Sequence, residues 1–247
     1  PLGLYTRAYA LMMLPAQRFN GPMTSVAVPA LARLADDPDA YRRTYVRALR
    51  AVAALMLPPV LLLGLLADVL VPLVLGAQWA DAVPIFIVLL PAACIAATNV
   101  ATGWVYLSLG HVDRQSRWGI YSAAVTIVAI IGSLSWGPIA VAGAVSATMV
   151  ALRLPGIFYC FHGTFMTIRD LYRALRTPVG ASVIAGWAGL WLRTLSITDT
   201  QFLIVVPLTY LGSFIACFAL SRDGRSMLAE MRSLLLHRRV GTGDTPR

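Results

Sequence analysis

Long apolar segments dominate the sequence, and this pattern constrains the fold more than any other feature. Each segment is close to the roughly 20 residues that an α-helix needs to cross a bilayer. Of the 247 residues, 58% are hydrophobic and 13% are charged, against about 25% charged in soluble proteins. We therefore predict an all-α, polytopic transmembrane helical bundle. The seven expected spans are 8–31, 51–66, 83–109, 118–134, 139–161, 178–192 and 202–220.

Arginine accounts for all 20 basic residues, and the net charge is +9. With seven spans, one side of the membrane receives the arginines of 33–50, 114–117 and 169–176 and six more after Ser221, while the other receives Arg7 and Arg193. The arginine-rich side is then cytoplasmic, the first span runs inward, and the C-terminal tail is cytoplasmic. Because these arginines lie between apolar segments, anionic lipids rather than nucleic acid are the expected partner.

Catalytic and metal-binding patterns are absent from the sequence. It has no GxSxG, HExxH, CxxC or P-loop motif, and its one glutamate is Glu230. The three cysteines lie in apolar segments and behave as small hydrophobic residues. We therefore expect no enzyme activity, no cofactor and no metal. The chain begins at Pro1 without a basic leader and cleavage site, so we expect a preceding part of the protein to be missing.

Prolines interrupt the first three spans. Pro15, Pro22 and Pro29 are seven residues apart, which places them near one side of the first helix. Each proline removes a backbone hydrogen bond, and a wet cavity or a neighbouring helix can satisfy the freed carbonyl. We expect these three residues, with Pro58 and Pro91 in the next two spans, to allow helix bends.

Polar side chains within the spans indicate a cavity. Arg18 and Arg153 lie inside predicted spans that contain no Asp or Glu. An aqueous, cationic cavity for an anionic substrate accounts for both charges, because guanidinium matches phosphate oxygens; the alternative is that both side chains reach the membrane surface. Gln17, Asn20 and Asn99 are candidates to hydrogen-bond substrate, or else to join helices.

Two arginine stripes flank the apolar segments. An amphipathic helix capped by Asp37 is expected to lie on the membrane surface over residues 38–50, and a second amphipathic stretch follows residue 167. The stripes are predicted to contact anionic lipid headgroups of the inner leaflet, or to gather a diphosphate headgroup. They consist of Arg43, Arg47 and Arg50, and of Arg169, Arg173 and Arg176.

Five stretches in a fixed order resemble bacterial polysaccharide flippases of the multidrug/oligosaccharidyl-lipid/polysaccharide exporter superfamily, in the polysaccharide transporter branch. They fall within residues 3–180. The last two spans match only in character. The stretches are GLYTRAYALMMLPAQRFNGPMTSVAVPALARLADDPDAYRR, LGAQWADAVPIF, TGWVYLSLGHVDRQSRWG, WGPIAVAGAVSA and TIRDLYRALRTP.

The resemblance implies two pseudo-symmetric lobes, of which this chain holds the second without its first helix, plus two extra helices. It implies movement of undecaprenyl-diphosphate-linked glycans across the inner membrane by alternating access, with a missing N-terminal lobe as partner. Arg18 lies in a matched stretch, and with Gln17 and Asn20 it is expected to face the diphosphate or acidic sugars. The expected division is lobe helices at 1–162, a cytoplasmic amphipathic linker at 163–178, two further spans at 179–220 and a basic tail at 221–247.

Two other functions remain open at this stage. A drug or lipid exporter of the same superfamily is expected to carry ion-coupling acids in its cavity, which these spans lack. A non-transporting scaffold of a polysaccharide synthase complex would have a polymerase or glycosyltransferase as partner. Both are alternatives to the flippase.

Overall fold

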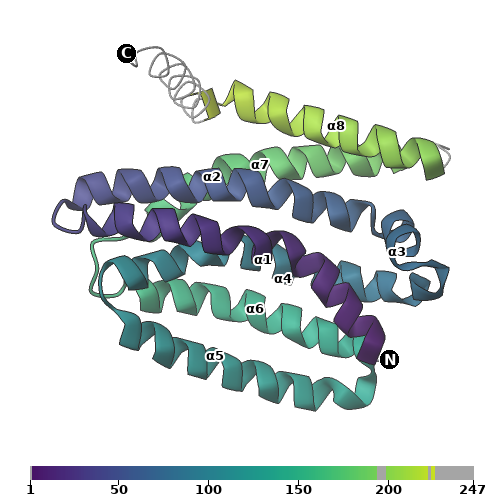
Figure 1. Ribbon diagram of the computed structural model, residues 1–247, viewed down its shortest axis with the longest axis horizontal. Helices are drawn as coiled ribbons and strands as arrows, with labels where there is room; N and C mark the ends of the chain where they lie inside the picture. The colour runs from purple at the N-terminus through teal and green to yellow at the C-terminus, as the bar shows by residue number, and fades with distance from the viewer. Residues whose placement is uncertain (1, 194–198, 222–223, 226–247) are drawn as a thin grey trace, which may run out of the picture.

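Helices make up the fold in the computed structural model, which describes residues 2–193, 199–221 and 224–225, and no strand occurs among these residues. Seven long helices lie side by side in one elongated bundle, with short helices at one end of it (Figure 1). The predicted all-α class is confirmed. The long helices are α1 (Leu2–Ala32), α2 (Pro38–Leu65), α4 (Val83–Ser108), α5 (Val112–Ser133), α6 (Pro138–Phe161), α7 (Ile168–Arg193) and α8 (Asp199–Leu220); the short ones are α3 (Ala67–Leu75), η1 (Ala77–Ala82) and η2 (Leu134–Trp136).

Five segments are long and apolar enough to cross a membrane by length and composition among the residues searched: Pro38–Leu65, Ala77–Ser108, Val112–Trp136, Pro138–Phe161 and Gln201–Leu220. They make the chain a multi-pass membrane protein. Two long helices remain. Helix α1 has 31 residues and packs against α2 and α4, and helix α7 has 26 residues and packs against α2 and α8. All seven predicted segments are thus helices, although two are less apolar than the others.

Helix α2 differs from the prediction of a separate surface helix followed by a span. Asp37 caps it by accepting hydrogen bonds from the amides of Asp39 (3.1 Å) and Ala40 (3.0 Å), and the helix continues to Leu65. Tyr41 and Tyr45 are fully buried. Because these aromatic side chains pack into the bundle, the segment does not lie on a membrane surface.

A similar continuity occurs in α7, which joins part of the predicted linker and the predicted sixth span in one helix, Ile168–Arg193. The proposed domain boundaries at residues 162, 178 and 220 stay predictions. The predicted tail from residue 221 lies almost entirely outside the described residues.

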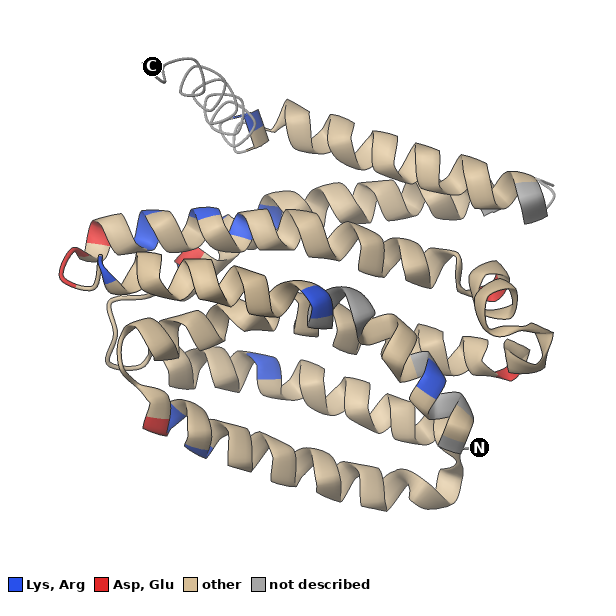
Figure 2. Cartoon of the chain, viewed as in Figure 1, with Lys and Arg blue, Asp and Glu red and all other residues tan. Residues whose placement is uncertain are grey.

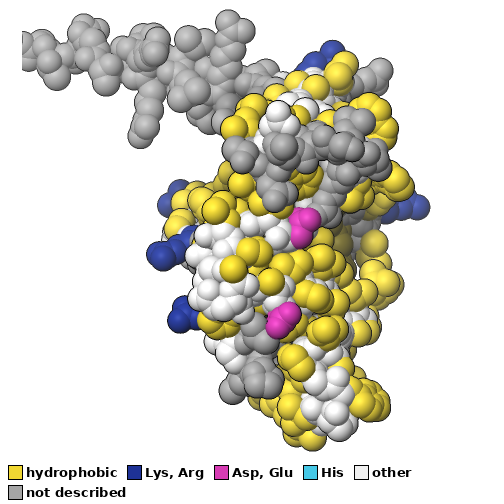
Figure 3. All heavy atoms as spheres, turned by 90° about the vertical axis from the view of Figure 1, so that its right-hand side faces the viewer, with side chains coloured by type: hydrophobic (Ala, Val, Ile, Leu, Met, Phe, Trp, Pro, Cys, Tyr) yellow, Lys and Arg dark blue, Asp and Glu magenta, His cyan; other side chains and the backbone are white. Residues whose placement is uncertain are grey.

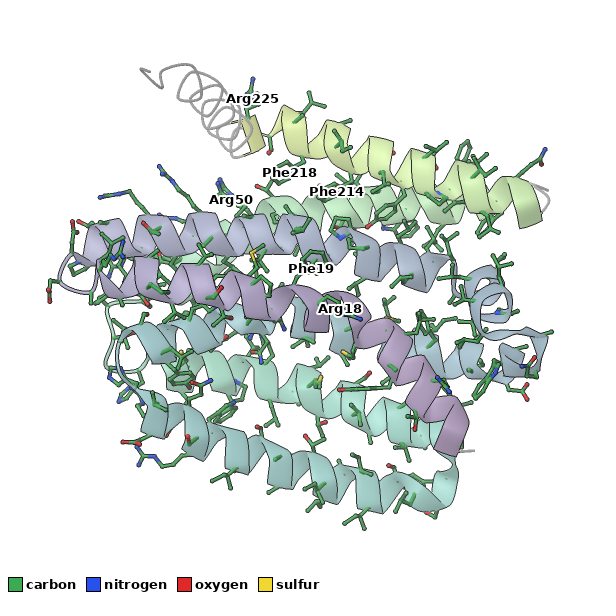
Figure 4. All side chains as sticks on the ribbon, viewed as in Figure 1. Arg18, Phe19, Arg50, Phe214, Phe218 and Arg225 are labelled. Atoms are coloured by element: carbon green, nitrogen blue, oxygen red, sulfur yellow. The ribbon has the colours of Figure 1, made fainter. Side chains whose placement is uncertain are left out.

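Two apolar cores hold the helices together. The larger core is formed mainly by α1, α2, α4 and α6, with Trp104, Phe86 and Leu49 fully buried or nearly so. The second lies between α7, α8 and the end of α2, where Phe214 and Phe218 stack at 5.8 Å (Figure 4). Helices α7 and α8 therefore form a hairpin with a core of its own.

Helix α5 is held at the edge of the bundle, chiefly by α6. Only 6% of the apolar stretch that makes this helix a candidate membrane span is buried, and Ile120 and Val128 are more than two-thirds exposed. The Trp118 side chain of α5 packs tightly against α6 at Gly156, where an added Cβ atom would lie 3.0 Å from three indole atoms. We expect the outer side of α5 to face lipid.

Charge is concentrated at one end of the bundle, where α2, α5 and α7 begin (Figure 2). The opposite end, formed by α3 and η1, carries Asp68 and Asp81. Viewed from that end, the surface is mainly hydrophobic or uncharged, with two acidic side chains (Figure 3).

Helix α1 bends near its middle, where Arg18 and Phe19 lie (Figure 4). Pro22, four residues after Arg18, has no N–H to offer the Arg18 carbonyl. Pro22 and Pro29 are exposed, whereas the side chain of Pro15 lies outside the described residues. Pro58 and Pro91 lie within α2 and α4, and their role as bending points stays a prediction.

Candidate functional site

A cleft of about 850 Å³ opens between α1, α4, α5 and α6. Each of these helices contributes polar side chains, so the cleft provides hydrogen-bonding groups within an apolar bundle. The polar lining consists of Asn20 and Thr24 from α1, Asn99, Thr102, Trp104 and Tyr106 from α4, Gln115, Trp118, Ser122 and Thr126 from α5, and Arg153 from α6.

Arg153 supplies the charge of this cleft. Its guanidinium donates to the Asn99 Oδ1 atom, to the Thr102 hydroxyl (3.0 Å) and to the Thr98 carbonyl (3.5 Å). These acceptors are neutral, and no Asp or Glu lines the cleft. A guanidinium with neutral partners and no acidic neighbour in the cleft favours an anionic ligand. The structure thus brings together Asn99 and Arg153, two predicted cavity residues from distant positions in the sequence.

The α1 wall of the cleft is fixed by a short hydrogen-bond chain. The Trp104 indole donates to the Thr24 hydroxyl (3.1 Å), which in turn donates to the Asn20 carbonyl (2.7 Å). This chain crosses from α4 to α1, and Asn20 is among the residues that line the cleft. The aromatic faces of Trp104 and Trp118 add flat apolar surface beside the polar groups.

Arg18 does not line this cleft, although the sequence analysis grouped it with Asn20 and Arg153. Two residues along an α-helix correspond to a rotation of about 200°, so Arg18 and Asn20 point to nearly opposite sides of α1. The Arg18 side chain is exposed. The side chain of Gln17, the third member of the predicted group, lies outside the described residues.

The α5 wall was missed by the sequence analysis. Gln115, Trp118, Ser122 and Thr126 line the cleft from one side of α5. Their spacing of three to four residues is a polar stripe of helical period, which is the signal that could have identified them. The stripe was obscured because α5 begins at Val112, before the start of the predicted span at residue 118.

A second hollow, of about 500 Å³, lies between α2 and α7. We call it the arginine groove. It unites most of both predicted arginine stripes, although Arg176 is not among its lining residues. The groove is lined by Asp39, Arg42, Arg43, Val46, Arg47, Arg50, Thr167, Arg169, Asp170 and Arg173.

Arginines of α2 that line this groove contact α7 and the segment that precedes it. Arg42 Nε donates to the Phe165 carbonyl (2.9 Å) and lies 3.9 Å from Asp170. Arg50, which is 9% exposed, donates to the Arg173 carbonyl at 3.1 Å. Half-buried Arg42 and buried Arg50 therefore have structural partners here, while the Arg43, Arg169 and Arg173 side chains are exposed.

The described residues contain no cluster of His, Cys, Asp or Glu able to hold a metal ion. The chemistry of the cleft and of the groove is that of hydrogen bonding and cationic charge. Both sites are suited to binding anionic or hydroxyl-bearing ligands.

The helical bundle is shared with a solved membrane protein. It is similar to the solved structure titled lipid II flippase MurJ, inward closed conformation, with a TM-score of 0.69 and 15% sequence identity over 88% of this chain and 46% of that chain. Residues 1–84 match the profile of a family described as polysaccharide biosynthesis protein.

Two characterised bacterial proteins are similar in sequence. The lipopolysaccharide biosynthesis protein WzxC of Escherichia coli strain K12 is 25% identical over 192 residues, covering 77% of this chain and 36% of that protein. The teichuronic acid biosynthesis protein TuaB of Bacillus subtilis strain 168 is 29% identical over 119 residues, or 47% of this chain and 24% of that protein. The chain thus spans about a third or less of these relatives. The likenesses confirm the resemblance to bacterial polysaccharide flippases, and the partial coverage fits one portion of a longer protein.

Proposed function

We propose that this chain is the C-terminal portion of a flippase that moves lipid-linked polysaccharide precursors across the bacterial inner membrane. The observation that carries the proposal is Arg153, a cation with neutral partners in a polar cleft among membrane helices. The names of the relatives and the flippase-like fold support the same class.

The cleft matches the chemistry of such a substrate. Arg153 would bind oxygens of the diphosphate that joins lipid and glycan, since guanidinium offers paired donors. Asn20 and Asn99 would hydrogen-bond sugar hydroxyls, and Trp118 offers an apolar face to a sugar ring. Binding by a fixed positive charge is stronger in a cleft that excludes much of the water.

The rest of the proposed mechanism involves the missing N-terminal lobe. Rocking of this lobe against that one would expose the cleft to each side of the membrane in turn. Arg18 lies on the exposed side of α1, away from the cleft, so we propose that it faces the partner lobe or a cavity between the lobes. A polysaccharide polymerase or glycosyltransferase complex is a further proposed partner, and the arginine-rich end and the tail are proposed to be cytoplasmic.

The test is lipid flipping by the full-length protein in liposomes, with a fluorescent diphosphate-linked glycan lipid as substrate. Arg153→Gln should slow flipping by about tenfold or more, because it removes charge-assisted hydrogen bonds worth roughly 1.5–3 kcal/mol each. Arg153→Lys keeps the charge and should retain part of the rate.

Arg117→Gln is the control, because Arg117 is exposed and does not line the cleft. Flipping by the Arg153→Gln protein at the parental rate would contradict the assignment of the cleft. Absence of flipping by the parent would favour the scaffold function.

A further inference from the structure

The arginine groove is built from two matching rows of charge. Arg43, Arg47 and Arg50 recur on α2 at intervals of four and three residues, and Arg169 and Arg173 repeat the first interval on α7. Residues so spaced share one side of a helix. The two rows face one hollow of about 500 Å³, so cations line both of its walls.

Acidic side chains balance only part of this charge. Six arginines and two aspartates line the groove, which leaves a net charge of +4. Asp39 and Asp170 both lie near Arg42, at 3.7 and 3.9 Å. Asp170 also accepts hydrogen bonds from the Thr167 amide and hydroxyl. The two acids thus lie around one arginine, while Arg43, Arg169 and Arg173 are exposed on the two walls, where their like charges repel one another.

This repulsion acts at the joint between two parts of the bundle. The α7–α8 hairpin has its own core and contacts the other helices chiefly through α2. At the groove end of this joint, Arg50 donates to the Arg173 carbonyl, while Arg43 on α2 and Arg169 and Arg173 on α7 bring like charges together across the groove. An anion in the groove would convert the repulsion into a bridge.

We propose that the arginine groove binds the phosphate headgroup of an anionic membrane lipid, and that the headgroup clamps the α7–α8 hairpin to α2. A lipid fits better than a free ion because α2 and α7 continue from the groove into apolar helix whose exposed side chains include Leu55 and Val179. Phosphate oxygens are strong acceptors for guanidinium. The site is separate from the Arg153 cleft and does not rest on the flippase function.

The test measures thermal unfolding of the full-length protein in nanodiscs of phosphatidylcholine alone or with phosphatidylglycerol. Arg43→Gln/Arg173→Gln removes one exposed arginine from each wall. Arg33→Gln/Arg117→Gln is the matched control, since it removes two exposed arginines outside the groove.

Phosphatidylglycerol should raise the melting temperature of the parent and of the control, because a ligand that binds the folded state stabilises it. The groove variant should bind this lipid about thirtyfold more weakly, at about 1 kcal/mol per arginine and 1.4 kcal/mol per tenfold. In phosphatidylcholine alone, the groove variant should melt at the parental temperature or above it, because the two substitutions relieve repulsion between the walls of the groove.

Three results would overturn the proposal. One is an equal rise in melting temperature of parent and groove variant on adding phosphatidylglycerol. Another is an equal loss of this rise in the groove variant and the control variant, which would show that the lipid responds to general surface charge. The third is full stabilisation by inorganic phosphate in phosphatidylcholine nanodiscs, which would make the ligand a free anion. If the double variant does not fold, Arg43→Gln replaces it with the same readouts.

Discussion

At the scale of single residues, the structure separates charges that the sequence presents alike. Arg153 and Asn99 are hydrogen-bonded in one cleft. Arg153 was predicted to be a cavity residue because it is a charge within an apolar segment. Arg18 satisfied the same criterion but lies away from the cleft. The sequence shows that a charge needs a polar environment, whereas the rotation of its helix and the position of neighbouring helices decide which environment it meets.

Asp170 gives a residue-scale prediction. It is 5% exposed, accepts two hydrogen bonds from Thr167 and lies 3.9 Å from Arg42. Asp170→Ala should reduce stability by about 1–3 kcal/mol, because it removes the buried acceptor of two Thr167 hydrogen bonds and the carboxylate beside Arg42. Thermal unfolding measures this loss.

Asp39→Ala is the control for that substitution. Asp39 approaches the same arginine at 3.7 Å, but its side chain is 78% exposed, and its removal should change stability by less than about 1 kcal/mol. Equal losses in the two variants would show that burial of Asp170 contributes nothing.

At the scale of elements, the apolar pattern predicted the existence of the helices better than their bounds. Residues 38–50 and 168–176 have the amphipathic pattern of surface helices, yet they are the first turns of α2 and α7. Their apolar sides, including Tyr41 and Leu171, pack in the bundle. A sequence pattern reports that one side of a helix is buried, but protein and membrane bury it equally well.

Close packing of α5 on α6 yields a prediction for these elements. Gly156→Val places new carbon atoms against the Trp118 indole, which also stacks with Tyr159 at 5.6 Å. Overpacking of this kind costs about 1–3 kcal/mol, and thermal unfolding should show a lower melting temperature. Gly180→Val is the control because a Cβ atom there meets nothing within 4 Å; a parental melting temperature for the Gly156 variant would contradict this account.

At the scale of the whole molecule, the distribution of arginine predicts orientation. The end with the 109–111 and 162–167 connections would be cytoplasmic, and the η2 end would be external. In a background with Cys94, Cys160 and Cys217 replaced by alanine, Trp136→Cys should react with a membrane-impermeant maleimide in intact cells. Thr164→Cys should react only after permeabilisation. The opposite labelling pattern would invert the topology.

The sequence predicted that the molecule is an all-α membrane bundle, but not which helices lie beside one another. Apolar segments of membrane length predict packed helices, and the five stretches that resemble polysaccharide flippases pointed to a membrane exporter. The cleft was only partly predictable, since Gln115 and Thr126 enter it through the placement of α5 beside α6 and α4. Such placement depends on contacts between distant segments, which one sequence does not display.

The presence of two separate cores bears on the order of events during synthesis. The larger core draws on α7 for only its first turns, including Leu171 and Ala174, whereas the smaller core needs α7 and α8 together with Leu65 and Leu66. A nascent chain can therefore complete most of the large core while its last two helices are still emerging from the ribosome. The hairpin then docks onto a surface that is already formed, so late insertion of α7 and α8 need not disturb the helices made before them.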